Sequence, residues 1–318
     1  MKRKLGKVKG RTRTATVVGP KLTTRMWKSR DYYIMLLPAV LYVLLFCYAP
    51  MYGLQIAFKD YKVALGVAGS PWVGFQNFID FFQSHYFITL LKNTLVLSLY
   101  TLIVGFPIPI VIALVLNELH GKFKKFTQTI LYAPHFISLV VLVSILNAML
   151  SPSQGVVNTI LEMLGMERNY FMANPDYFRH LYVWSGVWQG MGWGAIIYLA
   201  ALSGVDPALH EAADMDGATR IQKIIHINLP AIMPTIIIML ILRVGQIASV
   251  GYEKVYLMQN SMNIETAEII STYVYKRGII NSNYSFSAAV GLFNNVVNVI
   301  LVLIANRVSK KATDTSLF

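Results

Sequence analysis

Six apolar stretches, each long enough to cross a lipid bilayer as a helix, constrain this chain more than any other feature. A helix needs about 20 apolar residues to span the hydrocarbon core. The first stretch, residues 32–58, contains no charged residue. Five more follow, at 93–117, 126–150, 181–205, 231–249 and 288–306. We therefore predict an all-α, polytopic membrane protein with six transmembrane helices.

The composition agrees with this prediction, because only 14% of the residues are charged, against about 25% in soluble domains. The net charge of +13 is concentrated in residues 1–30, which hold eleven Lys or Arg and no acidic residue. A basic tail can bind nucleic acid, but beside a hydrophobic span it is more typical of a cytoplasmic segment that touches anionic lipid. We expect membrane lipids and no nucleic acid as partners.

Six spans place both termini on the same side of the membrane. The two tails, the 118–126 loop and the polar segment 206–230 together hold nineteen of the 28 Lys and Arg residues. By the positive-inside rule these parts are cytoplasmic. We predict a basic cytoplasmic tail at 1–31, a transmembrane domain at 32–306 and a second cytoplasmic tail at 307–318, in a multi-pass protein of the cell (inner) membrane.

Prolines interrupt two of the predicted spans. Pro107 and Pro109 lie inside the second span, and Pro134 with His135 lies inside the third. Proline lacks a backbone N–H and disturbs the preceding helical turn, so we expect kinks at both places.

Sequence patterns of catalysis are missing. The chain contains no G-x-x-x-x-G-K-[ST] loop, so it is not itself an ATPase. Its single cysteine, Cys47, lies in an apolar run, and its six histidines do not fall at metal-ligand spacing. We predict no catalytic residue, no metal site and no cofactor bound by this chain.

The segment 206–230 has the pattern of a helix pair. Asp206 can cap a helix, and Pro207 suits the first helical position. Gly217 permits a sharp turn, and Pro230 is expected to end the element. Two narrow apolar faces flank the turn, one on each side of it: Leu209, Ala212 and Ala213, then Ile221, Ile224 and Ile225. Such a pair suits either insertion into a groove on another protein or an amphipathic helix on the membrane surface.

Three pieces of this segment resemble a known signature. Glu211-Ala212-Ala213, Asp216-Gly217-Ala218 and Ile227-x-Leu229-Pro230 look like the EAA signature of permease subunits of binding-protein-dependent ABC importers. The resemblance implies a type I ABC importer permease fold, in which this segment is a cytoplasmic coupling helix that docks on an ATPase subunit. The residues that it marks for coupling are Glu211, Ala212, Ala213, Asp216, Gly217, Leu229 and Pro230.

Further stretches resemble the carbohydrate-uptake (MalF-like) branch of that family, and more narrowly permeases of the LplB/YteP type. They are residues 197–202, 251–255 and 288–293. The resemblance implies an oligosaccharide as cargo, a second related permease, two ATPase subunits that bind ATP and Mg, and an extracellular substrate-binding protein. Because the chain has one EAA segment, we expect a heterodimeric pore.

Four residues within the predicted spans are candidates for the substrate path. Trp184 and Trp188 lie four apart on one helical face, and Gln189 is adjacent. Indole rings stack on the apolar faces of sugars, while amides bind hydroxyl groups; the alternative for the tryptophans is an interfacial aromatic belt. Arg243 lies in the fifth span, where a cation is costly unless it faces a cavity or a partner. It either meets a polar cargo or extends to the membrane surface.

Two other classes of protein remain as alternatives. A secondary transporter or channel that does not use ATP would also have several spans, but secondary transporters usually contain two repeated halves. No second copy of the 206–230 pattern occurs in this chain. An ABC importer for a solute other than a sugar, and a membrane-embedded sensor subunit, stay open at this point.

Overall fold

All regular elements in the described part of the chain are helical. The computed structural model describes residues 27, 29–313 and 316–317. Within them a single isolated β-bridge joins Lys59 to Trp72. The chain divides into two units, Met1–Gly53 and Leu54–Phe318. The predicted all-α class is confirmed, whereas most of the basic tail predicted at 1–31 lies outside the described residues.

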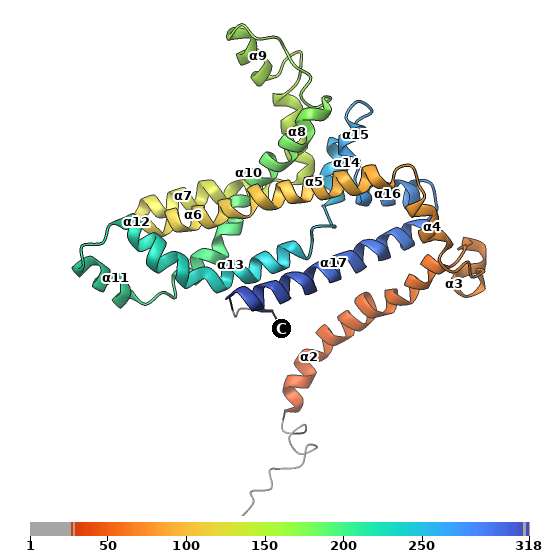
Figure 1. Ribbon diagram of the computed structural model, residues 1–318, viewed down its shortest axis with the longest axis horizontal. Coiled ribbons are helices and arrows are strands. Elements are labelled where there is room, and N and C mark those ends of the chain that lie inside the picture. The colour runs from red at the N-terminus through yellow and green to blue at the C-terminus, as the bar shows by residue number, and fades with distance from the viewer. Residues whose placement is uncertain (1–26, 28, 314–315, 318) are drawn as a thin grey trace, which may run out of the picture. The chain divides into compact units, whose positions relative to one another are not determined.

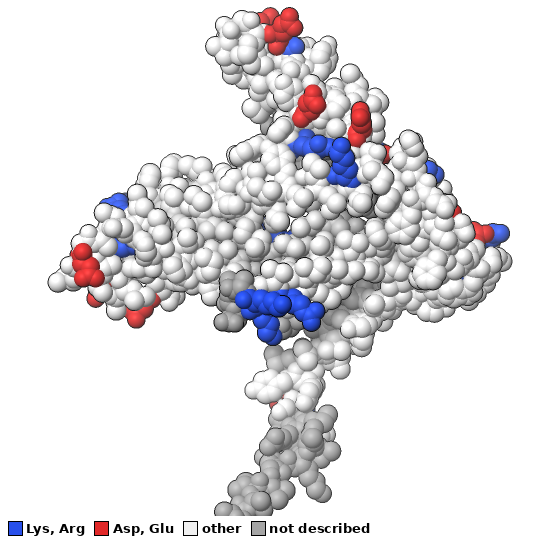
Figure 2. Space-filling view, viewed as in Figure 1, with Lys and Arg blue, Asp and Glu red and all other residues white. Residues whose placement is uncertain are grey.

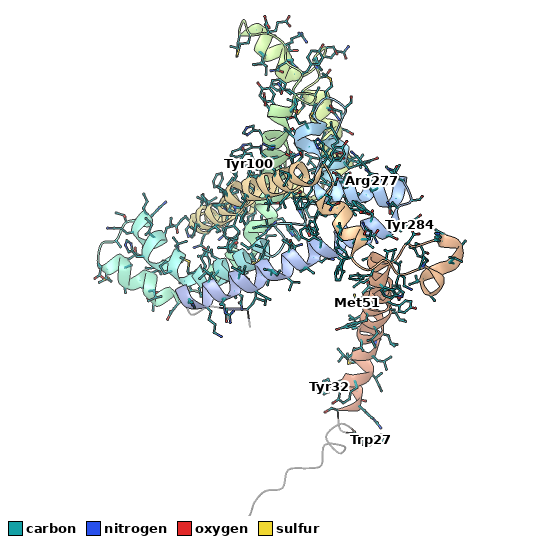
Figure 3. All side chains as sticks on the ribbon, turned by 45° about the vertical axis from the view of Figure 1, so that its right-hand side comes forward. Trp27, Tyr32, Met51, Tyr100, Arg277 and Tyr284 are labelled. Atoms are coloured by element: carbon teal, nitrogen blue, oxygen red, sulfur yellow. The ribbon has the colours of Figure 1, made fainter. Side chains whose placement is uncertain are left out.

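The first predicted span is a single helical run from Arg30 to Phe58. It comprises α2 (Arg30–Val43), the π-helical turn η1 (Leu44–Tyr48) and the 3₁₀ segment η2 (Ala49–Phe58). Most of its large apolar side chains are exposed, among them Tyr32 and Met51, which Figure 3 labels. This 29-residue helix contains an 18-residue window of mean hydropathy 2.2, so it is long and apolar enough to cross a bilayer.

Three further runs are long and apolar enough to span a membrane by themselves: Phe87–Glu118, Arg220–Val244 and Tyr284–Lys311. The first joins α5 (Phe87–Gly105) to α6 (Pro107–Glu118), with a break at Phe106. Pro107 occupies the first turn of α6, where its missing N–H leaves no hydrogen bond unmade. The second run contains α12 (Arg220–Lys223), η5 (Ile224–Asn228) and α13 (Leu229–Val244), and the third lies within α17 (Tyr284–Thr313).

The third predicted span, 126–150, is not one straight helix. It is formed by α7 (Gly121–Tyr132), η4 (Ala133–Phe136) and α8 (Leu139–Met149), and the chain bends by 97° between the two sides of the break. The break follows Pro134, because Ile137 is extended and Ser138 then caps α8 by accepting a bond from the Val141 N–H. A second bent pair, at 79°, joins α10 (Pro175–Leu202) to α11 (Pro207–Met215). The described residues thus contain four candidate spans, or up to six if each bent pair counts as one.

Helix α10 is central to the larger unit, where it packs against α5, α6 and α13. Figure 1 shows α13 running beside α17, with α11 and α12 at one end of these helices and α16 toward the other. A buried cluster that includes Ala113, Ala195 and Ile232 joins α6, α10 and α13. The remaining short elements are η3 (Val63–Leu65), α3 (Gly66–Gly69), α4 (Gln76–Phe82), α9 (Val156–Met163), α14 (Tyr252–Met258), α15 (Ile264–Ala267), α16 (Ile270–Tyr275) and η6 (Lys276–Ile280).

The fifth helix ends earlier than its hydropathy predicts. The apolar pattern extends to Ser249, but α13 stops at Val244 and the chain is irregular up to Gly251. Side chains of neighbouring helices donate hydrogen bonds to backbone carbonyl groups of this irregular segment. The Ser98 hydroxyl donates to the Ile247 carbonyl, and the Asn294 amide donates to the Ala248 carbonyl at 2.8 Å. The irregular segment is therefore a fixed part of the fold.

We predict that Gly192 is required for the close approach of α7 and α10. A Cβ atom at this position would collide with the backbone carbonyl of Leu131, whereas one at Gly190 would meet nothing within 4 Å. Gly192→Val should lower the free energy of unfolding by about 1–3 kcal/mol through overpacking. Thermal unfolding of the detergent-solubilised protein measures this, with Gly190→Ala as the control. Equal melting temperatures for Gly192→Val and the parent would contradict it.

Candidate functional site

The first half of the 206–230 segment forms a capped helix, as its sequence predicts. The Asp206 carboxylate accepts a hydrogen bond from the Ala208 N–H at 2.9 Å, and Pro207 occupies the first turn of α11. This cap satisfies one of the N–H groups that a helix start leaves unpaired. Because α11 bends away from α10 by 79°, it projects from the end of the helical bundle (Figure 1).

The turn between α11 and α12 depends on Gly217. Its φ of 74° lies in the left-handed region, which favours glycine. Across the turn, the Lys223 ammonium contacts the Asp214 carboxylate at 2.7 Å and so ties the two helices together. This ion pair was not predicted from the sequence, although acids before the glycine and bases after it are a detectable signal. Thr219 and Gln222 form a capping box that begins the second half.

The helix pair leaves an apolar and acidic surface open. Met215 is 89% and Ile221 69% exposed, and Leu209 is exposed as well. Glu211, Ala212 and Asp216 are also exposed, while Ala213 is partly buried. Figure 2 shows carboxylates gathered at this end of the protein. An exposed apolar face beside carboxylates is suited to a partner with a basic, partly apolar groove.

Pro230 does not end the element, and that prediction was wrong. The helix runs without interruption from Arg220 to Val244, so Pro230 lies inside it near the start of α13. A proline within a helix removes a donor and crowds the preceding turn. Here the residues before it form the π-helical turn η5, whose wider winding accommodates the ring. Leu229 packs against the cluster between α6 and α10 and anchors the start of α13.

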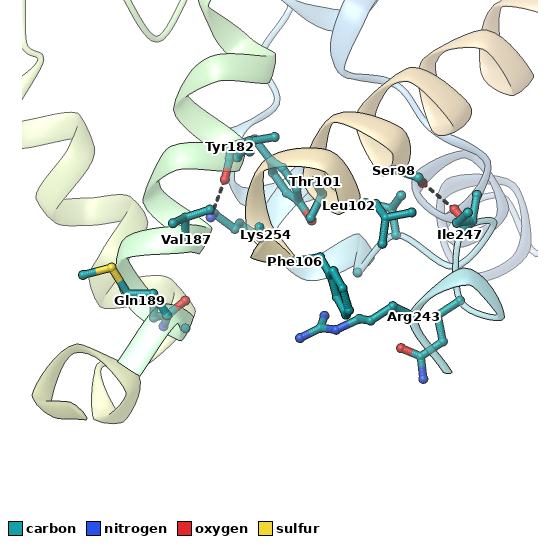
Figure 4. A pocket seen from close by; sticks show the side chains of 18 of the residues that line it. Ser98, Thr101, Leu102, Phe106, Tyr182, Val187, Gln189, Arg243, Ile247 and Lys254 are labelled. Carbon is teal, nitrogen blue, oxygen red and sulfur yellow. Dashed lines mark hydrogen bonds between the residues drawn. The ribbon is translucent and has the colours of Figure 1, made fainter. Parts of the chain in front are cut away.

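A cavity of about 380 Å³ lies between α5, α6, α10 and the irregular segment that follows α13. This volume falls in the range of small-molecule binding sites. The cavity has a mixed lining of hydroxyl, amide, apolar and cationic groups (Figure 4). The polar side chains among them are Ser98, Thr101, Tyr182, Gln189, Arg243, Gln246, Ser249 and Lys254.

The cavity has a positive lining. Arg243 and Lys254 both line it, and none of the described residues around it is an aspartate or glutamate. Lys254 lies on α14, outside the membrane-spanning segments, and burial lowers its pKa to about 8. Lys254 follows the fifth predicted span in the sequence, and no periodicity there indicates that α14 turns this lysine inward. Among the ion pairs of the described residues, none includes either cation, and two cations without a carboxylate partner suit an anionic ligand.

The structure brings two of the four predicted path residues to this cavity. Gln189 and Arg243 line it, and Figure 4 shows the Arg243 side chain extending past Phe106. Trp184 and Trp188 do not line it, and they are 52% and 43% exposed. Successive residues of a helix point about 100° apart, so adjacency to Trp188 in sequence does not give Gln189 the same face.

Gln189 also has a structural contact. Its amide donates a 2.7 Å hydrogen bond to the Ile137 carbonyl, at the break between η4 and α8.

Beside this break, His135 stacks on Trp193 with ring centres 4.4 Å apart. The described residues contain no group of three or more His, Cys, Asp or Glu side chains that could bind a metal ion.

Comparison with known proteins gives a consistent result. The model of the family "Binding-protein-dependent transport system inner membrane component" matches residues 94–314. The polygalacturonan/rhamnogalacturonan transport system permease protein YteP of Bacillus subtilis (strain 168) is 45% identical over 299 residues, which cover 94% of this chain and 93% of that protein.

Solved structures of alginate transporters resemble this one. A chain of a bacterial alginate ABC transporter, in complex with an alginate pentasaccharide-bound periplasmic protein, has a TM-score of 0.85 at 43% identity and covers 94% of this chain and 100% of its own. A bacterial ABC transporter involved in the import of the acidic polysaccharide alginate also has a TM-score of 0.85, at 44% identity, covering 92% and 99%.

We predict that the Gln189 bond stabilises the broken helix. Gln189→Leu leaves the Ile137 carbonyl without this donor and should lower the free energy of unfolding by about 1–3 kcal/mol. Thermal unfolding in detergent measures the change. Gln246→Leu is the control, because Gln246 lines the same cavity but is exposed. A Gln189→Leu protein as stable as the control would contradict the prediction.

Proposed function

The chain belongs to the family of inner membrane components of binding-protein-dependent transport systems, and we propose that it forms one half of the pore of an ATP-driven importer for acidic oligosaccharides. The observation that carries the proposal is the capped, exposed helix α11, which projects from the bundle with an open apolar and acidic surface. As a transport permease the chain moves its cargo, and ATP is hydrolysed on separate subunits.

The proposed topology has six spans with both termini in the cytoplasm. Counting each bent helix pair as one span gives this number. The last turns of α17 carry Arg307, Lys310 and Lys311, which are exposed, and basic residues favour the cytoplasmic side. In this arrangement residues 32–306 form the permease domain of the type I fold, and 1–31 and 307–318 are cytoplasmic tails that contact lipid.

Coupling to ATP hydrolysis is assigned to the 206–230 segment. The exposed Glu211 carboxylate can accept a charge-assisted hydrogen bond from a basic groove on an ATPase subunit. Ala212 and Ala213 keep that face narrow, and Asp216 adds a second exposed carboxylate beside the Gly217 turn. Through Leu229 and Pro230 the segment continues into α13 without a break.

The proposed assembly contains this chain, a second related permease, two ATPase subunits that bind ATP and Mg, and an extracellular substrate-binding protein. One EAA segment per chain supports the second permease. A similar solved chain comes from a transporter in complex with a periplasmic protein that holds an alginate pentasaccharide, which supports the binding protein.

Acidic oligosaccharides are the proposed cargo for two reasons. The similar proteins serve polygalacturonan/rhamnogalacturonan and alginate transport, and the cavity has cations without carboxylates. We assign Arg243 to the carboxylates of the cargo and Gln189 to its hydroxyl groups. Trp184 and Trp188 offer exposed indole faces, and we assign them to stacking where the second permease completes the path.

We predict that Glu211 and Gly217 transmit motion between ATPase and pore. Glu211→Ala removes a charged acceptor, and Gly217→Val strains a backbone with positive φ by about 1–3 kcal/mol. Each variant should insert in the membrane normally, yet lower ATP-dependent uptake of an oligogalacturonate by about tenfold or more. Uptake and cargo-stimulated ATP hydrolysis are measured in vesicles that contain the complete importer.

The control for this experiment is Glu167→Ala, which removes an exposed glutamate from the loop after α9, outside the coupling segment. It should leave uptake and ATP hydrolysis unchanged. Normal cargo-stimulated hydrolysis and normal uptake in both the Glu211 and the Gly217 variants would remove the basis of the proposal.

We also predict that Trp188 contributes to the path. Trp188→Ala should lower oligosaccharide uptake about tenfold while the permease pair still assembles. The sugar rings would lose an aromatic stacking partner, and the stacking of a ring on an aromatic side chain contributes about 1–3 kcal/mol. Trp188→Phe keeps an aromatic face and should retain most of the uptake. If Trp188→Ala transports at the parent's rate, the two exposed tryptophans belong to an interfacial belt instead.

A further inference from the structure

The cavity contains a buried lysine that has no carboxylate partner. Lys254 is only 6% exposed, and none of the ion pairs among the described residues includes it. Its ammonium donates a 2.8 Å hydrogen bond to the backbone carbonyl of Tyr182 on α10 (Figure 4). The same ammonium lies 4.8 Å from the centre of the Tyr182 ring. Burying a cation on neutral acceptors alone is costly, so its position calls for an explanation.

A second buried lysine shows what a purely structural version of this arrangement looks like. Lys59 is 3% exposed, donates to the Val67 carbonyl at 2.6 Å and lies 4.7 Å from the centre of the Trp72 ring. It has the same two kinds of contact as Lys254, a backbone carbonyl and an aromatic face. Lys59 does not line the cavity, whereas Lys254 does. The difference between them is access to a ligand.

Gly186 allows the Lys254 ammonium to reach α10. A Cβ atom at position 186 would lie 3.1 Å from the Lys254 Nζ, which is closer than most side chains tolerate. Gly186 also lines the cavity, one helical turn from Tyr182. A methyl group here would push the ammonium away from the Tyr182 carbonyl without changing the charge of the site.

We propose that Lys254 selects anionic cargo in the cavity and that Gly186 positions its ammonium for this task. The inference rests on the proposed function and adds a residue to it. A carboxylate of the cargo replaces the Tyr182 carbonyl as the acceptor, and a charged acceptor binds an ammonium more strongly than a neutral one. Arg243 is the second cation of the lining. Two acidic units of one oligosaccharide can therefore each bind a cation in the cavity.

The proposal predicts how uptake depends on pH. Burial lowers the pKa of Lys254 to about 8, so the cationic form is present below pH 8 and is lost as the pH rises. Among the residues that line the cavity, Tyr182 and Arg243 are the other titratable ones. A guanidinium stays charged throughout and an ordinary phenol ionises only near pH 10. Uptake of an anionic cargo should therefore fall between pH 7 and 9, and Lys254→Arg should flatten that fall.

The test compares two cargoes in vesicles that contain the complete importer and its binding protein. One is trigalacturonate, and the other is the same trisaccharide with its carboxyl groups reduced to alcohols. Lys254→Gln should lower trigalacturonate uptake about tenfold and uptake of the reduced trisaccharide less than twofold. Gly186→Ala should lower trigalacturonate uptake about threefold, because it displaces the ammonium without removing it.

Two control variants separate charge selection from packing. Lys59→Gln removes the comparable buried lysine and should not change the ratio of the two uptake rates. Gly291→Ala adds a methyl group to a helical glycine of α17 where nothing lies within 4 Å, and it should change neither rate.

Three outcomes would overturn the proposal. If Lys254→Gln lowers both rates equally, Lys254 is a packing residue like Lys59. If Lys254→Gln transports trigalacturonate at the parent's rate, the ammonium does not contact the cargo. If the parent importer takes up neither trisaccharide, or prefers the reduced one, the acidic cargo itself is wrong and anion selection by Lys254 falls with it. The first two outcomes leave the proposed function intact, whereas the third does not.

Discussion

Every backbone N–H and C=O in a membrane-embedded chain needs a partner, because hydrocarbon offers none. Long helices satisfy this requirement by themselves, and the described structure departs from them at only a few places. At two of these places polar side chains from neighbouring helices provide the missing partner. Gln189 binds the Ile137 carbonyl at the break before α8, while Ser98 and Asn294 bind carbonyls of the segment after α13. The irregular segment after α13 also lines the cavity, so fold and site share one constraint.

Local patterns predicted much of the fold, and the first helix and the turn of the 206–230 segment. Apolar runs located the long helices, and Asp206, Pro207 and Gly217 gave the cap and the turn that the structure has. Helix ends were less predictable, because hydropathy continues to Ser249 while the helix stops at Val244. Proline is a weak stop signal when a π-helical turn can absorb it, which is why Pro230 lies inside a helix.

The cavity could not be read from the sequence, because it combines residues that are far apart in the chain. Arg243 was identified from the cost of burying charge, and Gln189 from its place beside Trp188. Lys254 belongs to a short polar stretch whose inward direction depends on how α14 packs against α10. Trp184 and Trp188 were grouped with Gln189 through sequence adjacency, although a helix separates neighbouring residues by about 100°.

The unbroken helix from Arg220 to Val244 has a mechanical consequence. Its 25 residues correspond to a rod about 37 Å long at 1.5 Å per residue. One end joins the glycine turn, and the other carries Arg243 at the cavity. A rod of this length pivoted by about 10° at the turn displaces its far end by about 6 Å, comparable to one helical turn. A small rotation at the glycine turn would thereby become a larger movement of the helix end beside the cavity.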